Sequence, residues 1–221
     1  MKTQNAFNCI SILLLTCCIS QPAFAQKGAD RININGEFVL AAKAGRTERV
    51  TALLTEGAAV NSRDRNGDSP LNMAASKGNE ALADILMRAG ADVNLANIAG
   101  VTPLMGAAFS GNAQLARKLM AAGAKTDPID QVKKNAAIYA AGVGCKECLA
   151  ALLRAGAPVN ARLENDETLL MWAAGYGHVS TVQFLLDQGA DRSLKDNRGK
   201  TAADIARDGN FTAVAKLLET N

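Results

Sequence analysis

The sequence predicts an all-α solenoid of about six 33-residue helix-turn-helix repeats with short β-hairpin or turn connections. Gly-Ala recurs at this spacing from Gly57-Ala58 to Gly189-Ala190, and Ala-Ala recurs with the same period from Ala41-Ala42 to Ala173-Ala174. A leucine also keeps one position in successive copies, as Leu53, Leu86, Leu119, Leu152, Leu185 and Leu218. A fixed period of this length is typical of stacked units that bury their apolar faces against each other.

Each element of a repeat has a physical reason in the sequence. Two copies open their first helix with a capping residue followed by proline, in Gly67-Asp68-Ser69-Pro70-Leu71 and Gly100-Val101-Thr102-Pro103-Leu104. The Ser or Thr can accept a hydrogen bond from a first-turn amide, and proline fits where no backbone donor is needed. The paired alanines let helices approach closely, and the leucine fills the core. The Gly of Gly-Ala is expected to end the second helix in a left-handed conformation.

These motifs resemble the ankyrin repeat over about residues 33–221. The resemblance implies a turn or hairpin, a first helix, a tight glycine turn, a second helix and a loop in each repeat. Arg207 stands in the last copy where inner copies have alanine, as a polar capping repeat requires. The expected repeats cover about residues 33–61, 62–94, 95–127, 128–160, 161–193 and 194–221.

Three departures from the ankyrin pattern predict local weaknesses. Repeat four reads Lys133-Lys134-Asn135-Ala136-Ala137 where Gly-x-Thr-Pro-Leu is expected, which puts its hairpin in question. The turn glycine of the last repeat comes early, at Gly209. The histidine of the Thr-Pro-Leu-His motif is replaced, so we expect its local hydrogen bonds to be missing. The replacing residues are Asn72, Met105, Ile138 and Met171.

The N-terminal segment differs from the repeats. Lys2 precedes an apolar run over residues 9–20 that is too short to span a bilayer. Ala23-Phe24-Ala25 matches a signal-peptidase site. We expect residues 1–25 to be a cleaved secretory signal and residues 26–32 a leader. A buried helix, a membrane anchor and lipidation at Cys17 are the alternatives. A cleaved signal predicts a periplasmic protein without membrane insertion.

Composition and motifs argue against several functions. A net charge of +3 with interspersed acids and bases gives no basic footprint for nucleic acid. Nucleophile-elbow, Walker-type and dinucleotide-binding glycine patterns are missing from the sequence. The single histidine, His178, is expected to be structural or exposed, and one His with two Cys makes no recognisable zinc site. The sequence therefore predicts no enzyme, cofactor or metal centre.

Cys145 and Cys148 are the cysteines that remain after the signal. The period places them at the start of the second helix of repeat four, with Cys148 facing the core. A structural disulfide is the favoured interpretation. Two buried free thiols remain an alternative. A redox-active pair is another, because a helix N-terminus lowers the pKa of a thiol.

The resemblance implies that partners dock on the hairpin tips and the exposed side of the first helices. Ile98, Val101 and Phe109 are expected to form one apolar patch with an aromatic anchor; packing on neighbouring repeats is the alternative. Trp172 is expected in the core. The candidate partner-binding residues are Arg65, Asp68, Lys77, Ile98, Val101, Phe109, Lys134, Glu164, Glu167 and Tyr176.

The function expected from these features is protein binding by an adaptor or inhibitor in the bacterial periplasm. The protein is expected to be a monomer when free and to bind an envelope protein. Immunity against a periplasmic enzyme or toxin would fit. The alternatives are an envelope redox or oxidative-stress factor that uses Cys145 and Cys148, and a secreted host-directed effector.

Overall fold

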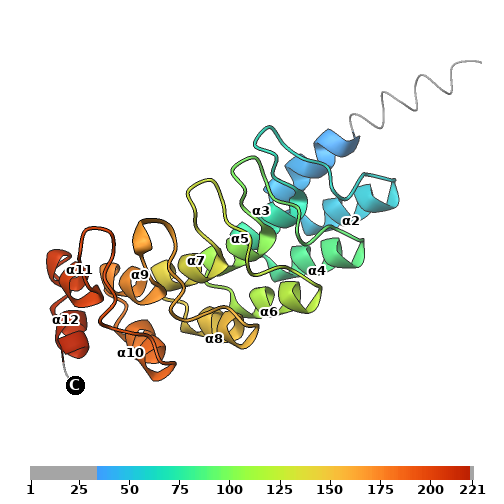
Figure 1. Cartoon of the computed structure of the whole chain (residues 1–221). Helices are drawn as coiled ribbons and strands as arrows, with labels where there is room; N and C mark the ends of the chain where they lie inside the picture. Colours follow the sequence, from blue (N-terminus) through green and yellow to red (C-terminus); the bar gives the residue numbers. More distant parts are fainter. Residues whose placement is uncertain (1–33, 220–221) are drawn as a thin grey trace, which may run out of the picture.

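The computed structural model describes residues 34–219 and shows a row of helix pairs, coloured from blue to red along the chain in Figure 1. The expected signal (residues 1–25) and leader (residues 26–32) lie outside the described residues. Within the described part every regular element is helical, and the expected hairpins are hydrogen-bonded turns without strands. The predicted all-α solenoid is confirmed.

Each repeat contributes a first helix and a second helix. The first helices are a helix over residues 34–43, α3 (Pro70–Ser76), α5 (Pro103–Phe109), α7 (Ala136–Val143), α9 (Leu169–Gly175) and α11 (Ala202–Asp208). The second helices are α2 (Thr47–Thr55), α4 (Glu80–Arg88), α6 (Ala113–Ala121), α8 (Lys146–Arg154), α10 (Val179–Asp187) and α12 (Thr212–Glu219). A short 3-10 turn, η1 (Glu164–Asp166), precedes α9. The loops between pairs project above the first helices in Figure 1.

The core follows the period of the sequence. Five of the six recurring leucines are fully buried, and the sixth, Leu218, is 4% exposed. The paired alanines of repeats one to five are also buried. Each buried leucine contributes about 1.5–3 kcal/mol relative to an exposed one, so this column of side chains stabilises the stack.

Close approach of neighbouring first helices requires a small residue in α5. A Cβ atom added to Gly106 would lie 2.8 Å from the Ser76 Oγ and 3.0 Å from the Ser76 backbone nitrogen. The glycine therefore lets α5 pack directly against the end of α3.

Most first helices begin with the expected side-chain cap. Ser69 accepts a hydrogen bond from the Asn72 amide, and Thr102 accepts one from the Met105 amide. In repeat four, Asn135 takes this place and accepts from the Ile138 amide. A helix start without the Thr-Pro motif is thus still capped.

The hairpin of repeat four is formed, although its sequence departs from the ankyrin pattern and put the hairpin in question. The Asp130 amide donates to the Lys134 carbonyl at 2.9 Å, and the Asp130 Oδ1 accepts from the Val132 and Lys134 amides at 3.0 and 2.9 Å. Asp130 therefore holds the turn as Asp64 and Asp196 do in their repeats. The turn strains the backbone of Lys133, which has a φ of 58°. This value lies in the left-handed region that favours glycine.

The prediction that replacing the motif histidine removes its hydrogen bonds is wrong for repeat two. The Asn72 Oδ1 accepts from the Ser69 amide and hydroxyl at 3.1 and 2.6 Å. The Asn72 Nδ2 also donates to the Val101 carbonyl of the next repeat at 3.0 Å. An asparagine carries both a donor and an acceptor, so it can replace the imidazole here.

The turn of the last repeat keeps its register, which corrects the expectation of an early turn at Gly209. Gly209 has an ordinary φ of −81°, whereas Asn210 has a φ of 62°. Asn210 lies one period after Gly177, and asparagine tolerates the left-handed conformation better than most residues.

Candidate partner-binding surface

Hydrogen bonds between successive hairpins hold their tips in line. The Ile98 amide donates to the Asn66 carbonyl at 3.0 Å, and the Gln131 amide donates to the Ala99 carbonyl at 2.8 Å. The Asn197 amide repeats this contact with the Asn165 carbonyl at 2.9 Å. The hairpin tips of repeats two to four, and those of repeats five and six, are therefore fixed relative to one another. This lowers the entropic cost of presenting them to a partner.

Two pairs of aromatic side chains lie on the first helices of repeats three to five. The Phe109 ring meets the Tyr139 ring edge to face, with centroids 5.9 Å apart. In repeat five the Trp172 and Tyr176 rings stack with centroids 6.1 Å apart. Phe109 is 58% exposed and Tyr176 is 55% exposed, so large apolar area faces solvent at both ends of this row.

Lys134 joins the two aromatic pairs. Its ammonium lies 4.5 Å from the centre of the Trp172 ring and 5.9 Å from the centre of the Tyr139 ring. Attraction between a cation and an aromatic face orders all three side chains. We call the set of Phe109, Lys134, Tyr139, Trp172 and Tyr176 the aromatic surface.

A cavity of about 250 Å³ opens beside the aromatic surface, between α9 and α11. Burial raises the pKa of the Glu167 carboxyl, although Arg198, 3.5 Å away, and Lys134 favour its charged form. The Trp172 Nε1 is buried and has no hydrogen-bond partner among the described residues. The lining residues are Glu167, Met171, Trp172, Gly175, Tyr176 and Ile205.

Trp172 is half-buried and packs against the core, and it also lines this cavity. Trp172 therefore contacts the core on one side, as expected, and borders the cavity on the other.

Tyr139 was missed as a candidate. It precedes Trp172 by one period, so the repeat pattern alone places the two in equivalent positions of neighbouring repeats.

The three residues expected in one apolar patch have different surroundings. Ile98 is 67% exposed at a hairpin tip, where it lies against Gly67 of the preceding hairpin. Val101 is half-buried and packs on the core, while Phe109 ends α5 and contacts repeat four. Ile98 and Val101 thus precede α5, whereas Phe109 is its last residue; that the three form one patch stays a prediction.

The polar candidates have mixed surroundings. Arg65 is exposed, whereas the Asp68 carboxylate accepts a hydrogen bond from the Asn97 side chain at 2.7 Å. The Lys77 ammonium donates to the Lys43 carbonyl. Glu164 begins η1 at the tip of hairpin five. Arg65 and Lys77 are exposed residues, whereas Asp68 is partly buried.

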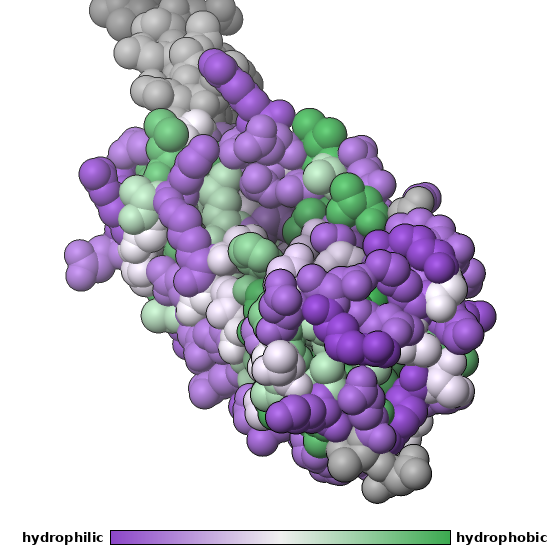
Figure 2. Space-filling model, turned by 90° about the vertical axis from the view of Figure 1, so that its left-hand side faces the viewer, coloured by the Kyte–Doolittle hydropathy of each residue, from purple (hydrophilic) through white to green (hydrophobic). Residues whose placement is uncertain are grey.

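Figure 2, which views the stack from its C-terminal end, shows a mostly hydrophilic surface interrupted by apolar atoms. Some of these gather in the upper part of the view, the side on which the loops project in Figure 1. Besides Ile98, the exposed apolar residues of the hairpins include Val132, which is 62% exposed. The hairpin side thus offers both charge and apolar area.

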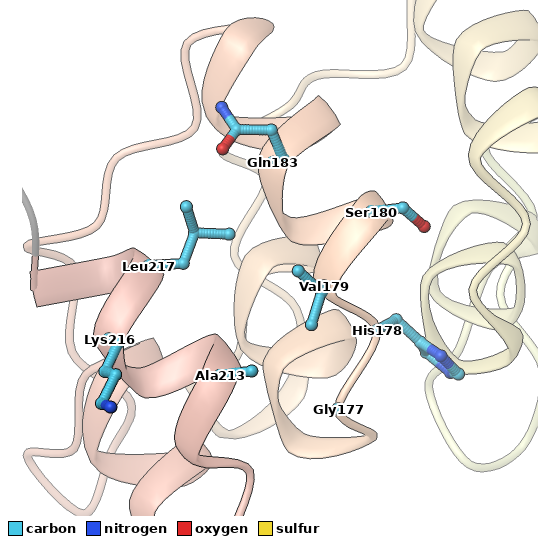
Figure 3. Close-up of a pocket in the computed structure, with 8 residues that line it drawn as sticks. All are labelled: Gly177, His178, Val179, Ser180, Gln183, Ala213, Lys216 and Leu217. Carbon is cyan, nitrogen blue, oxygen red and sulfur yellow. The ribbon is translucent and has the colours of Figure 1, made fainter.

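A second, wide groove of about 880 Å³ lies between α10 and α12 (Figure 3). His178 belongs to its rim, but Figure 3 shows the imidazole directed away from the groove. Its Nε2 lies 2.9 Å from the Gly142 carbonyl oxygen of the preceding repeat, and its ring stacks on Tyr176. These contacts agree with the structural role expected for His178. The groove is lined by Gly177, His178, Val179, Ser180, Gln183, Ala213, Lys216 and Leu217.

The structure joins Cys145 and Cys148 by a disulfide, with the sulfurs 2.06 Å apart. Cys145 is the N-cap residue of α8, and Cys148 lies in its first turn. Over the described residues, no group of three or more His, Cys, Asp or Glu side chains could hold a metal ion. No helix in that part of the chain is long and apolar enough to cross a membrane.

Stacked helix pairs with ordered hairpin tips define a repeat protein of the solenoid class. A family model described as ankyrin repeats (three copies) matches residues 38–131 and again residues 137–221. The chain therefore belongs to the ankyrin-repeat family, whose repeats are protein-interaction modules and generally not catalytic. No curated protein matches the chain significantly.

Proposed function

We propose that this ankyrin-repeat protein binds a folded protein partner in the bacterial periplasm through its aromatic surface. The observation that carries the proposal is the continuous contact from Phe109 through Tyr139, Lys134 and Trp172 to Tyr176, across three repeats. Large aromatic side chains near the centre of an interface supply most of its binding energy.

The side chains and hairpins of the proposed binding surface are already ordered in the free protein, which favours partner binding. The rings of the aromatic surface already form two contacting pairs joined by Lys134, and hydrogen bonds connect neighbouring hairpin tips. A partner would therefore immobilise few additional side chains on binding.

The cavity beside Trp172 suits a side chain of a partner better than a separate small ligand. Its volume is about 250 Å³. Small-molecule sites usually enclose more, about 300–1000 Å³. Glu167 and Arg198 place both charge signs at this site. Mixed charges are expected at a protein interface, whereas a nucleic-acid site needs a basic surface.

The proposed location rests on the N-terminal signal expected from the sequence. Fractionation of producing cells and the intact mass of the exported protein test it. Cleavage after Ala25 and recovery from the periplasm are expected, whereas retention of Met1 in a cytoplasmic protein would contradict the location but not the binding surface.

Within the periplasm we propose an adaptor or inhibitor, with protection against an envelope enzyme or toxin as one such role. A surface on one side of a solenoid can cover a site on its partner without chemistry of its own. Inhibition would appear as loss of the partner's activity on addition of the purified protein, whereas unchanged activity would favour the adaptor.

Site-specific photo-crosslinking in producing cells tests the proposed surface. A photoreactive phenylalanine analogue at position 176 is expected to capture one protein that the same analogue at position 179 does not. Position 179 is a matched control, because Val179 is exposed at 43% and lies in the groove of Figure 3. Equal capture from both positions would contradict the proposal.

A further inference from the structure

The disulfide of repeat four lies at a helix N-terminus, a position that stabilises a thiolate and so favours thiol–disulfide exchange. Cys145 caps the N-terminus of α8, and its sulfur accepts a hydrogen bond from the Cys148 amide at 3.2 Å. Such a donor, together with the helix dipole, stabilises a thiolate and lowers the pKa of the thiol. Cys145 is therefore a good leaving group whenever it is bonded to another sulfur.

Burial makes the two sulfurs unequal. Cys145 is 9% exposed, whereas Cys148 is fully buried. The Cys145 side is thus the more accessible one for an external thiolate.

The register of the repeats shows how the reduced pair is accommodated. Asn79 and Asn112 occupy the place of Cys145 in repeats two and three, and each caps its second helix. The Asn112 Nδ2 also donates to the Gly78 carbonyl at 3.2 Å. The Cys145 sulfur lies 3.4 Å from the equivalent carbonyl of Gly111, within reach of a thiol donor. A thiol at Cys145 can therefore make both contacts that asparagine makes.

We propose that Cys145 and Cys148 form a reversible redox site that exchanges with external dithiols while the protein stays folded. This site is separate from the aromatic surface, which is made by the hairpins and first helices, and the proposal does not depend on partner binding. Burial shields the Cys148 sulfur from oxidants in solution.

Exchange proceeds in two balanced steps. A thiolate of the dithiol attacks the Cys145 sulfur, a mixed disulfide forms, and the bond to Cys148 breaks with protonation of its sulfur. The second thiolate of the reagent then attacks the reagent sulfur that is bonded to Cys145 and closes the reagent's own disulfide. Cys145 leaves as a thiolate and takes up a proton. The dithiol becomes a disulfide, and its two electrons and two protons pass to Cys145 and Cys148.

Single-cysteine variants test the asymmetry that this mechanism requires. In a full chain with Cys9, Cys17 and Cys18 replaced by serine, Cys148→Ala leaves Cys145, and Cys145→Asn leaves Cys148 with an asparagine cap. With a chromogenic aromatic disulfide as probe, Cys145 is expected to react at least about ten-fold faster than Cys148. Equal rates in folded variants would overturn the proposal.

The reduction of the parent disulfide supplies a second test. Dithiothreitol is expected to reduce the pair at least about ten-fold faster than the chain unfolds globally, because folded-state exchange does not wait for unfolding. The helical circular dichroism should remain unchanged, and removal of the reductant in the presence of oxidised glutathione should restore the disulfide. Reduction only at the rate of global unfolding would show a purely structural disulfide and overturn the proposal.

Discussion

The ammonium of Lys134 lies 4.5 Å from the centre of the Trp172 ring, so the hairpin of repeat four is connected to the first helix of repeat five. Trp172 is the single tryptophan of the chain. Its fluorescence therefore reports on this contact without interference from another indole.

Lys134→Gln is expected to shift the emission of Trp172, because the cation near the indole ring is removed. The stability should fall by about 0.5–1 kcal/mol, the size of a partly exposed cation–aromatic contact. Steady-state fluorescence and urea unfolding measure both effects. Lys133→Gln is the matched control, since Lys133 is exposed and contacts no ring among the described residues; an equal emission shift in both variants would refute the contact.

The Tyr139 hydroxyl donates to the Asp130 carboxylate at 2.5 Å, and Asp130 is 4% exposed. Tyr139→Phe should destabilise the protein by about 1.5–3 kcal/mol, the range for a hydrogen bond to a charged group. Because the ring remains, the contact with Phe109 should survive. Urea unfolding of the variant checks this value. A loss below about 0.5 kcal/mol, less than an ordinary neutral hydrogen bond contributes, would mean that the bond adds little to hairpin four.

Lys133→Gly is expected to stabilise the protein. A left-handed backbone costs a non-glycine residue about 1–2 kcal/mol, and the larger unfolded-state entropy of glycine offsets about 0.4–1 kcal/mol of the gain. The net increase in unfolding free energy should be about 0.5–1 kcal/mol. Urea unfolding measures it. Lys133→Ala keeps the backbone penalty and serves as control; if alanine stabilised as much as glycine, the left-handed turn would not be the cause.

Much of the fold could be predicted because the period repeats strong local signals. The Gly-Ala pairs, the buried leucines and the capping residues each specify the same architecture in several copies. The departures were harder to interpret. Lys133 and Asn210 both adopt the left-handed conformation that the pattern assigns to glycine. Asparagine tolerates this conformation, whereas lysine disfavours it, and Lys133 adopts it in a turn that the Asp130 carboxylate holds.

The candidate surface was predicted less well. Phe109, Lys134 and Tyr176 were identified, but the contact of Phe109 with Tyr139 was not. Position along the repeat specifies which helix carries a residue, whereas the pairing of rings depends on rotamers and on the gap between helices. Tyr139 and Trp172 were accessible to prediction, since they are separated by one period.

Asp204 predicts a pH dependence in the last repeat. Hydrogen bonds from the Thr201 amide and hydroxyl, at 2.9 and 2.7 Å, lower the pKa of its carboxyl below the usual 3.8. A depressed folded-state pKa gives stability that is present above the unfolded-state value and is lost as the pH falls through the folded-state value. The urea midpoint should therefore decrease below about pH 4, and Asp204→Asn should reduce this decrease; an unchanged acid response in Asp204→Asn would contradict the assignment.

The most direct test of partner binding is calorimetric titration of the captured partner with three proteins: the parent, Phe109→Ala and Val179→Ala. Phe109→Ala should weaken binding by about 2 kcal/mol or more, roughly 30-fold in Kd, as truncation of an aromatic anchor does. Its unfolding free energy should fall by no more than about 0.5–1.5 kcal/mol, the contribution of the edge-to-face contact with Tyr139, because Phe109 is 58% exposed in the free protein. Val179→Ala, an apolar truncation in the groove between α10 and α12, should bind like the parent. Parent-like affinity of Phe109→Ala, or an equal loss in Val179→Ala, would contradict binding through the aromatic surface.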